Sequence, residues 1–256
     1  MRRANEAKLP EGSLGRAFLE FSQMPGIHEE HVLSEINLAF IAGHETTAHS
    51  LSWVIYALCK FPNIQTRVQQ EIDAFDKSET KDGLLPDYIE AVVKESMRKY
   101  PVANGSFRMV TKEDGYDLDK YHLEQGDWIV INLFVVHNLE RNWGPDVDEF
   151  KPERWLPASE AEPNPLSSPA VYAGGGQTPN SIAFLPFSVG VRNCLGMNMA
   201  LLEMRLTLAR LVKRYSFRFV DEKMADESYA LERALFLSPK DKLPVYVLRR
   251  ATARTK

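Results

Sequence analysis

A single cysteine placed between two glycines is the group in this chain best suited to chemistry. Cys194 lies in residues 187–196 (FSVGVRNCLG), with Arg192 two positions before it and Gly190 and Gly196 on its two sides. Glycine allows the backbone to turn tightly and to approach a bulky group closely. The pattern therefore indicates a cysteine presented on a tight loop beside a cation.

A helix is predicted to begin directly after this cysteine. Apolar residues recur every three to four positions over 197–215, namely Ala200, Leu201, Met204, Leu208 and Leu211. Cys194 then lies at or just before the helix N-terminus, where exposed N–H groups and the helix dipole favour a thiolate. A thiolate held in this way is either a metal ligand or a nucleophile, and the segment alone leaves both open.

A second unusual stretch interrupts the longest predicted helix, which covers 29–61 and ends before Pro62. Residues 42–47 (AGHETT) place a glycine, a carboxylate and two threonines inside an apolar span. Gly43 alone costs about 1 kcal/mol relative to alanine in a helix interior. Because broken local rules often mark function, the stretch is a candidate site. The alternative is a kinked core helix.

A third predicted helix, over 87–100, carries an acid and a base on one face. Glu95 and Arg98 are three positions apart, so their side chains are neighbours on the helix. The alternative is an ordinary solvated ion pair, which stabilises a protein little. After this helix the periodicity favours short strands, predicted over 105–110, 121–123, 128–133, 215–220 and 245–249.

Composition and charge exclude several classes of protein. The 256 residues are 44% hydrophobic and 26% charged, with a net charge of −4, which is ordinary for a globular protein and gives no argument for nucleic-acid binding. The two cysteines, Cys59 and Cys194, are too few for a disulfide framework. No run resembles a signal peptide or reaches the roughly 18 apolar residues of a membrane span. We therefore expect neither feature in this chain.

Four separated segments occur in an order that is typical of one known family. They are residues 42–47 (AGHETT), 95–98 (ESMR), 152–155 (PERW) and 187–196, the last of which fits Phe-x-x-Gly-x-Arg-x-Cys-x-Gly at every fixed position. Together they resemble the cytochrome P450 superfamily of haem-thiolate monooxygenases, in its eukaryotic microsomal form, and residues 235–249 resemble its terminal hairpin. The resemblance implies a mainly α fold with small β-sheets (α+β). Residues 1–256 would form a single partial domain, the C-terminal portion of the cytochrome P450 fold without its N-terminal half.

The resemblance implies that the cysteine segment binds a cofactor. Cys194 would be the axial thiolate on the iron of haem b, where it favours O–O cleavage. Phe187 would pack near the sulfur, and N–H groups around the cysteine would tune it. Gly190 and Gly196 would let the backbone approach the macrocycle closely.

The resemblance also assigns the charged residues. Arg192 and Arg108 sit where the family binds the haem propionates. Glu95, Arg98 and Arg154 would form a buried ion triad that supports the haem side of the fold. The loss of one member would leave a buried unpaired charge, at a cost of about 3–5 kcal/mol.

The stretch in the long helix would handle oxygen. Thr46 and Glu45 would manage a proton relay to bound dioxygen, and Ala42 and Gly43 would leave a groove for it. The chain would then activate O2 and insert one oxygen atom into a lipophilic substrate.

By the same resemblance, NADPH-cytochrome P450 reductase or a similar donor would supply electrons, so that NADPH takes part indirectly, and no nucleic acid is implied. Four basic residues of the 197–215 helix would form a docking face for an acidic reductase: Arg205, Arg210, Lys213 and Arg214. The alternative for these cations is the attraction of a helix C-terminus.

Two expectations concern the chain as a whole. A full-length parent would lie on the cytosolic face of the endoplasmic reticulum membrane. The alternative to a working monooxygenase is a truncated, non-catalytic product or an interaction fragment that cannot hold haem alone.

Overall fold

The computed structural model describes residues 9–75, 85–156, 183–233 and 236–251. The chain divides into two compact units, Met1–Glu45 and Thr46–Lys256. Helix α2 (Glu29–Lys60) contributes residues to both units. The helix was expected over 29–61, and it continues without a break through the AGHETT stretch.

The first unit contains α1 (Leu14–Ser22) and the beginning of α2. The hydroxyl of Ser13 accepts a hydrogen bond from the Arg16 N–H and so caps α1. Gly26, at φ +81°, forms the turn that follows, a left-handed conformation that favours glycine. These local signals explain where α1 begins and why the chain turns between α1 and α2.

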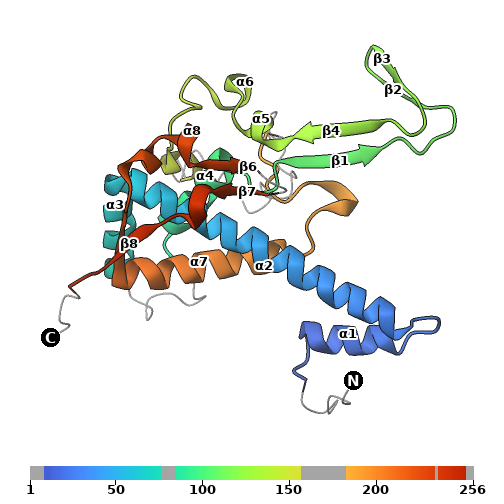
Figure 1. Ribbon diagram of the computed structural model, residues 1–256, viewed down its shortest axis with the longest axis horizontal. Helices are drawn as coiled ribbons and strands as arrows, with labels where there is room; N and C mark the ends of the chain where they lie inside the picture. The colour runs from blue at the N-terminus through green and yellow to red at the C-terminus, as the bar shows by residue number, and fades with distance from the viewer. Residues whose placement is uncertain (1–8, 76–84, 157–182, 234–235, 252–256) are drawn as a thin grey trace, which may run out of the picture. The chain divides into compact units, whose positions relative to one another are not determined.

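The second unit is built from helices that share one apolar core (Figure 1). Helices α3 (Pro62–Ala74), α4 (Asp87–Lys99) and α7 (Met197–Arg214) pack against one another, and residues of α2 from Thr46 onward join the same core. Its most deeply buried large side chains include Trp53, Tyr56, Leu58, Tyr88, Ile89, Phe184, Met204 and Leu208. Pro62 lies in the first turn of α3, where its missing N–H costs nothing.

A buried amide ties three of these elements together. The Gln65 side chain accepts a hydrogen bond from the Phe217 N–H at 2.7 Å and donates to the carbonyls of Leu58 and Phe217, both at 3.0 Å. These bonds satisfy main-chain groups that would otherwise be buried without partners. The α2 end, α3 and the strand that carries Phe217 are therefore held as one block.

The strands form small antiparallel sheets. The described residues contain four two-stranded sheets, which pair β1 (Gly105–Met109) with β4 (Trp128–Asn132), β2 (Tyr116–Leu118) with β3 (Tyr121–Leu123), β5 (Tyr215–Phe219) with β8 (Val245–Arg249), and β6 (Leu231–Arg233) with β7 (Leu237–Pro239). The β2–β3 hairpin continues outward from the β1–β4 pair (Figure 1). The expected class, mainly α with small β-sheets, is confirmed.

Several short elements had no counterpart in the sequence prediction. They are β2, β6 and β7, the helices α5 (Leu133–His137), α6 (Glu140–Trp143) and α8 (Glu227–Ala230), and the 3₁₀ turns η2 (Pro152–Trp155), η5 (Gly190–Arg192), η6 (Glu222–Ala225) and η7 (Lys240–Lys242). Periodicity is a weak signal for elements of three to five residues, because the pattern needs a longer window, so only some of the short elements were predicted.

The end of the chain differs from a single hairpin over 235–249. Strand β7 pairs with β6, whereas β8 pairs with β5. Asp241, Lys242 and Leu243 all have positive φ values, and this left-handed turn redirects the chain between β7 and β8. Residue 235 itself lies outside the described residues.

None of the helices in the described ranges is both long and apolar enough to cross a membrane.

Candidate functional site

The cysteine segment folds back on itself to form a closed loop. The Cys194 N–H donates to the Phe187 carbonyl at 2.9 Å, and the Ser188 N–H donates to the Leu185 carbonyl at 3.0 Å. The turn between them uses positive φ values at Ser188 (+62°) and Gly190 (+80°). A side chain at residue 190 would be strained in this conformation, which explains the glycine there.

Cys194 lies directly before α7, as the sequence predicts. Its carbonyl accepts the Met197 N–H at 3.4 Å, and Gly196 occupies the N-cap position of the helix. The thiol is exposed and lies at the positive end of the helix dipole, which favours negative charge. A Cβ at Gly196 would lie 4.0 Å from the sulfur, so this glycine keeps the sulfur accessible on that side.

The second cysteine has opposite properties. Cys59 is buried in the core of the second unit. Burial, followed by the charge of Glu222, raises the pKa of the Cys59 thiol to about 12. Cys59 is therefore a packing residue, and Cys194 is the cysteine available to a ligand.

The loop around Cys194 exposes apolar groups. Val191 and Leu195 have exposed fractions of 100% and 101%, and Met199 and Leu202 on the first turns of α7 are more than half exposed. Contiguous exposed apolar groups mark a surface that binds an apolar partner or ligand. Exposed apolar side chains thus lie near Cys194 along the chain, on both sides of it.

The two candidate propionate-binding cations are both exposed. Arg192 ends the η5 turn. Arg108 lies on β1 and donates to the Ser106 hydroxyl at 3.0 Å and to the Phe107 carbonyl at 2.8 Å. The Ser106 and Ser188 hydroxyls are 3.5 Å apart, so β1 lies beside the cysteine loop. The structure therefore brings the strand of Arg108 to the loop that carries Arg192.

The oxygen motif is divided between the two compact units. Ala42, Gly43 and Glu45 belong to the first unit, whereas Thr46 and Cys194 belong to the second. Ala42 and Glu45 are exposed, and Gly43 and Thr46 are half-buried. The joint action of these residues with Cys194 stays a prediction.

The structure brings Glu95, Arg98 and Arg154 together in the core of the second unit. Arg98 binds the Glu95 carboxylate with two nitrogens, Nε at 2.9 Å and Nη2 at 2.8 Å. Arg154 Nε donates to the same carboxylate at 3.2 Å. Glu95 and Arg98 are fully buried, so this group is not a surface ion pair.

Two further donors to Glu95 were missed by the sequence analysis. The Lys151 main-chain N–H donates to the carboxylate at 2.8 Å, and Trp155 Nε1 donates at 2.9 Å. Trp155 follows Arg154 within the segment that resembles the family motif, and Lys151 directly precedes that segment, so the signal was close to a predicted residue. The carboxylate is thereby satisfied on both oxygens, as a buried charge requires.

Comparison with known proteins assigns this chain to a family. The family model for cytochrome P450 matches residues 13–245. The chain belongs to the cytochrome P450 family. It is 32% identical over 194 residues to cytochrome P450 3A19 of Capra hircus aegagrus, covering 74% of this chain and 80% of that protein.

More distant organisms carry similar P450 proteins. Putative cytochrome P450 CYP13A7 of Caenorhabditis elegans is 34% identical over 200 residues, covering 75% of this chain and 35% of that protein. Cytochrome P450 monooxygenase 205 of Postia placenta is 31% identical over 234 residues, covering 84% of this chain and 40% of that protein.

The fold agrees with this membership. The crystal structure of a cytochrome P450, CYP102L1, superposes with a TM-score of 0.67 at 26% identity, covering 88% of this chain and 47% of that one. Cytochrome P450 3A19 is covered over most of its length. Of other curated P450 relatives, this chain spans only between 34% and 40% of the length.

P450 proteins use haem, and the residues of the cysteine loop fit that group. The thiol of Cys194 is exposed at a helix N-terminus, and no described atom lies within 4 Å of a Cβ built on Gly190. Exposed apolar side chains, Val191 and Leu195, and a cation, Arg192, lie on the same loop as Cys194. Soft thiolate, apolar walls and cations are the groups that a haem and its propionates require.

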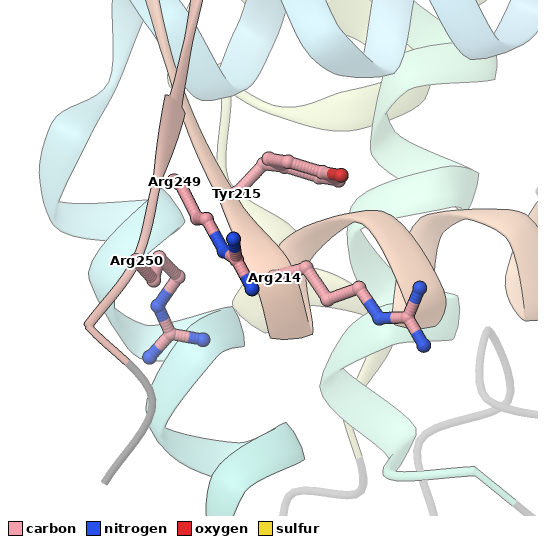
Figure 2. Close-up of a pocket in the computed structure, with 4 residues that line it drawn as sticks. All are labelled: Arg214, Tyr215, Arg249 and Arg250. Atoms are coloured by element: carbon pink, nitrogen blue, oxygen red, sulfur yellow. The ribbon is translucent and has the colours of Figure 1, made fainter.

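A separate pocket lies at the other end of α7. Its volume is about 430 Å³, and its walls are Arg214, Tyr215, Arg249 and Arg250 (Figure 2). Arg250 donates to the Val212 carbonyl at 2.7 Å and pairs with Asp73 at 2.5 Å. Cations near the carbonyl end of a helix complement its dipole. The arginines that line this pocket are therefore explained by their attraction to the C-terminus of α7.

Proposed function

We propose that this chain carries the haem-binding part of a P450 monooxygenase, in which Cys194 would supply the thiolate ligand of the haem iron. The observation that carries the proposal is the exposed thiol at the N-terminus of α7, on a loop closed by the Phe187–Cys194 hydrogen bond. When bound, haem b supplies the iron at which dioxygen is activated for insertion of one oxygen atom into a lipophilic substrate.

The cysteine loop and β1 would hold the cofactor by charge and shape. Arg192 and Arg108 would bind its propionates, because exposed guanidinium groups pair with carboxylates. Phe187 packs against the core of the second unit and would fix the loop behind the sulfur. Gly190 and Gly196 carry no side chain that would block the macrocycle.

The AGHETT stretch would control proton delivery. The Thr46 hydroxyl would hold a proton beside the oxygen site, and the Glu45 carboxylate would exchange it with solvent. Glu45 is exposed and Thr46 half-buried, which suits a path from water to the interior. Ala42 and Gly43 would leave space for dioxygen, because neither has a side chain larger than a methyl group.

The ion triad would support the site from behind. Arg98 also donates to the Glu149 carbonyl at 2.9 Å, and Arg154 donates to the Asp146 carbonyl at 3.2 Å. Together with the bonds to Glu95, these contacts fix residues 146–155 against α4. The triad would therefore hold the haem side of the fold rather than touch the reaction.

Electrons would come from an NADPH-cytochrome P450 reductase or a similar donor, and a full-length parent would lie on the endoplasmic reticulum membrane. The structure changes which cation on α7 suits docking. Arg205 is partly buried and pairs with Glu90 at 3.1 Å, whereas Arg210 is exposed. Reversal of charge at Arg210 should slow reduction more at low salt than at high salt. A salt-independent rate would contradict this docking face.

A second candidate function is a non-catalytic product or interaction fragment. The observation that favours it is coverage, since the chain spans only 34–40% of most of these relatives. In that case the site residues are present, but the chain cannot hold haem alone.

The deciding experiment is the carbon monoxide difference spectrum of the chain, expressed with haem and reduced with dithionite. We expect a thiolate-type, red-shifted Soret band that is lost in Cys194→Ala and retained in Cys59→Ala. A band that survives Cys194→Ala would refute the ligand assignment. The absence of any thiolate band in the unaltered chain would favour the non-catalytic product.

A further inference from the structure

We infer that His137 is a positioning residue that fixes the start of the cysteine loop by accepting a hydrogen bond from the Leu185 main-chain N–H. The role of that loop in haem binding rests on the proposed function, whereas the hydrogen bond itself does not. This histidine could not be identified from the sequence, because it lies outside every motif.

Three hydrogen bonds lead from His137 to Cys194. Nε2 of His137 accepts the Leu185 N–H at 2.8 Å. The Leu185 carbonyl accepts the Ser188 N–H at 3.0 Å, and the Phe187 carbonyl accepts the Cys194 N–H at 2.9 Å. Leu185 is thus held on both sides, by its N–H and by its carbonyl, before the chain turns toward the sulfur.

The opposite side of His137 is held by the ion triad. Arg98 Nη1 donates to the His137 carbonyl at 3.1 Å. The imidazole is 0% exposed and lies 5.4 Å from the ring of Phe184, the residue before Leu185. His137 therefore joins two regions that the sequence analysis treated separately, the triad on α4 and the loop of Cys194.

The imidazole must be neutral at Nε2 to accept this bond. Burial lowers the pKa of His137 to about 3; the Met97 carbonyl opposes the shift, and the charge of Arg98 adds to it. The ring proton then sits on Nδ1, because Nε2 is the acceptor. A ring kept neutral in this way accepts the Leu185 N–H throughout the range in which the protein would work.

Three variants distinguish the loss of the hydrogen-bond acceptor from a change in the volume of the side chain. His137→Phe fills the cavity but removes the acceptor. His137→Gln places a carbonyl oxygen near the position of Nε2 and should restore the bond. His137→Asn is polar but too short to reach it, and it replaces the phenylalanine variant if that protein does not fold.

Gln65→Leu is the matched control. Gln65 also accepts a buried main-chain N–H, that of Phe217, at 2.7 Å, but it lies on α3 away from the cysteine loop. Its loss should therefore disturb the core without releasing Leu185 or Cys194.

The measurement is amide hydrogen exchange on the whole chain. We expect His137→Phe, or His137→Asn in its place, to speed exchange at Leu185 and Cys194 by about tenfold relative to the rest of the core. His137→Gln should stay close to the unaltered chain, and Gln65→Leu should affect Phe217 instead. Unchanged exchange at Leu185 and Cys194, or an increase that is uniform over the core, would overturn the inference.

The carbon monoxide spectrum distinguishes this inference from the proposed function. If the unaltered chain has a thiolate band, His137→Phe should lose part of it and His137→Gln should keep it. If the unaltered chain binds no haem while the exchange result holds, the positioning role stands and the proposed function fails.

Discussion

Glu95 and Cys194 belong to the same compact unit and have opposite surroundings. The buried Glu95 carboxylate accepts hydrogen bonds from two arginines, a tryptophan and a main-chain N–H. The Cys194 thiol is exposed on a loop with two left-handed residues and fully exposed apolar neighbours. The first region has all its partners within this chain, and the second directs its groups outward. Stability and ligand binding are therefore assigned to separate parts of the unit.

The largest expected effect tests the region around Glu95, whose charged groups have their partners within this chain. Glu95→Gln would leave the fully buried Arg98 guanidinium without the carboxylate it pairs with, so the free energy of unfolding should fall by about 3–5 kcal/mol. Chemical denaturation measures this change. Glu153→Gln is the control, because the Glu153 side chain is 47% exposed and pairs with Arg67, and it should cost less than about 1 kcal/mol. Equal losses in the two variants would remove the contrast between a buried and a surface pair.

The next effect is a loss of stability in acid. It arises at His137, which links the region around Glu95 to the loop of Cys194. Its pKa is about 3 in the folded chain and ordinarily 6.5. Between these values the unfolded state binds a proton and the folded state does not, so stability falls as pH drops from about 6.5 toward 3. The slope is about 1.4 kcal/mol per pH unit for this group.

Denaturation at several pH values checks this expectation. His137→Gln has no titrating ring, so its stability should fall less steeply over the same interval. A variant that loses stability with acid as steeply as the unaltered chain would show that His137 is not the group responsible.

A smaller effect compares two glycines. Gly190 has φ +80° in the cysteine loop, so Gly190→Ala should cost about 1–2 kcal/mol through backbone strain. Gly43 lies inside α2, and apart from its chain neighbours and the helix's own backbone no described atom lies within 4 Å of a Cβ built there, so Gly43→Ala should add about 1 kcal/mol to the free energy of unfolding. Thermal unfolding measures both. Changes of the same sign would show that the conformation of the loop glycine is not what distinguishes it.

The smallest expected effect on stability belongs to the cysteine itself. Cys194→Ala should change the free energy of unfolding by no more than about 0.5 kcal/mol, because the side chain is exposed. The same substitution should abolish fast labelling of the chain by a thiol reagent, since Cys59 is buried with a raised pKa. Rapid labelling that persists without Cys194 would mean that Cys59 is accessible.

The long elements and the motif residues could be predicted from sequence. Helix α7 was expected over 197–215 and is observed over Met197–Arg214, because its apolar repeat is long enough to define a face. The spacing of Glu95 and Arg98 placed them on one face of α4, and the resemblance added Arg154. The resemblance also implied that they are buried, but the spacing alone could not show this, because burial depends on residues 146–155 folding over that face.

The contacts that position the loop could not be predicted. His137 and Leu185 are 48 positions apart, and neither lies in a periodic or motif pattern. Helix α5, which ends at His137, is only five residues long. Short elements of this kind are fixed by tertiary contacts, so a single sequence carries little sign of them. The pairing of β5 with β8 is a long-range contact of the same sort.

Helix α7 also has a mechanical meaning. At 1.5 Å per residue it is a rod about 27 Å long, with the sulfur at one end and the anchorage of Arg250 to Asp73 and Val212 at the other. A tilt of about one degree at the anchored end would displace the sulfur end by about 0.5 Å, which is the tolerance of a well-built site. The position of the Cys194 sulfur thus depends on contacts far from it, those that Arg250 makes at the carboxyl end of α7.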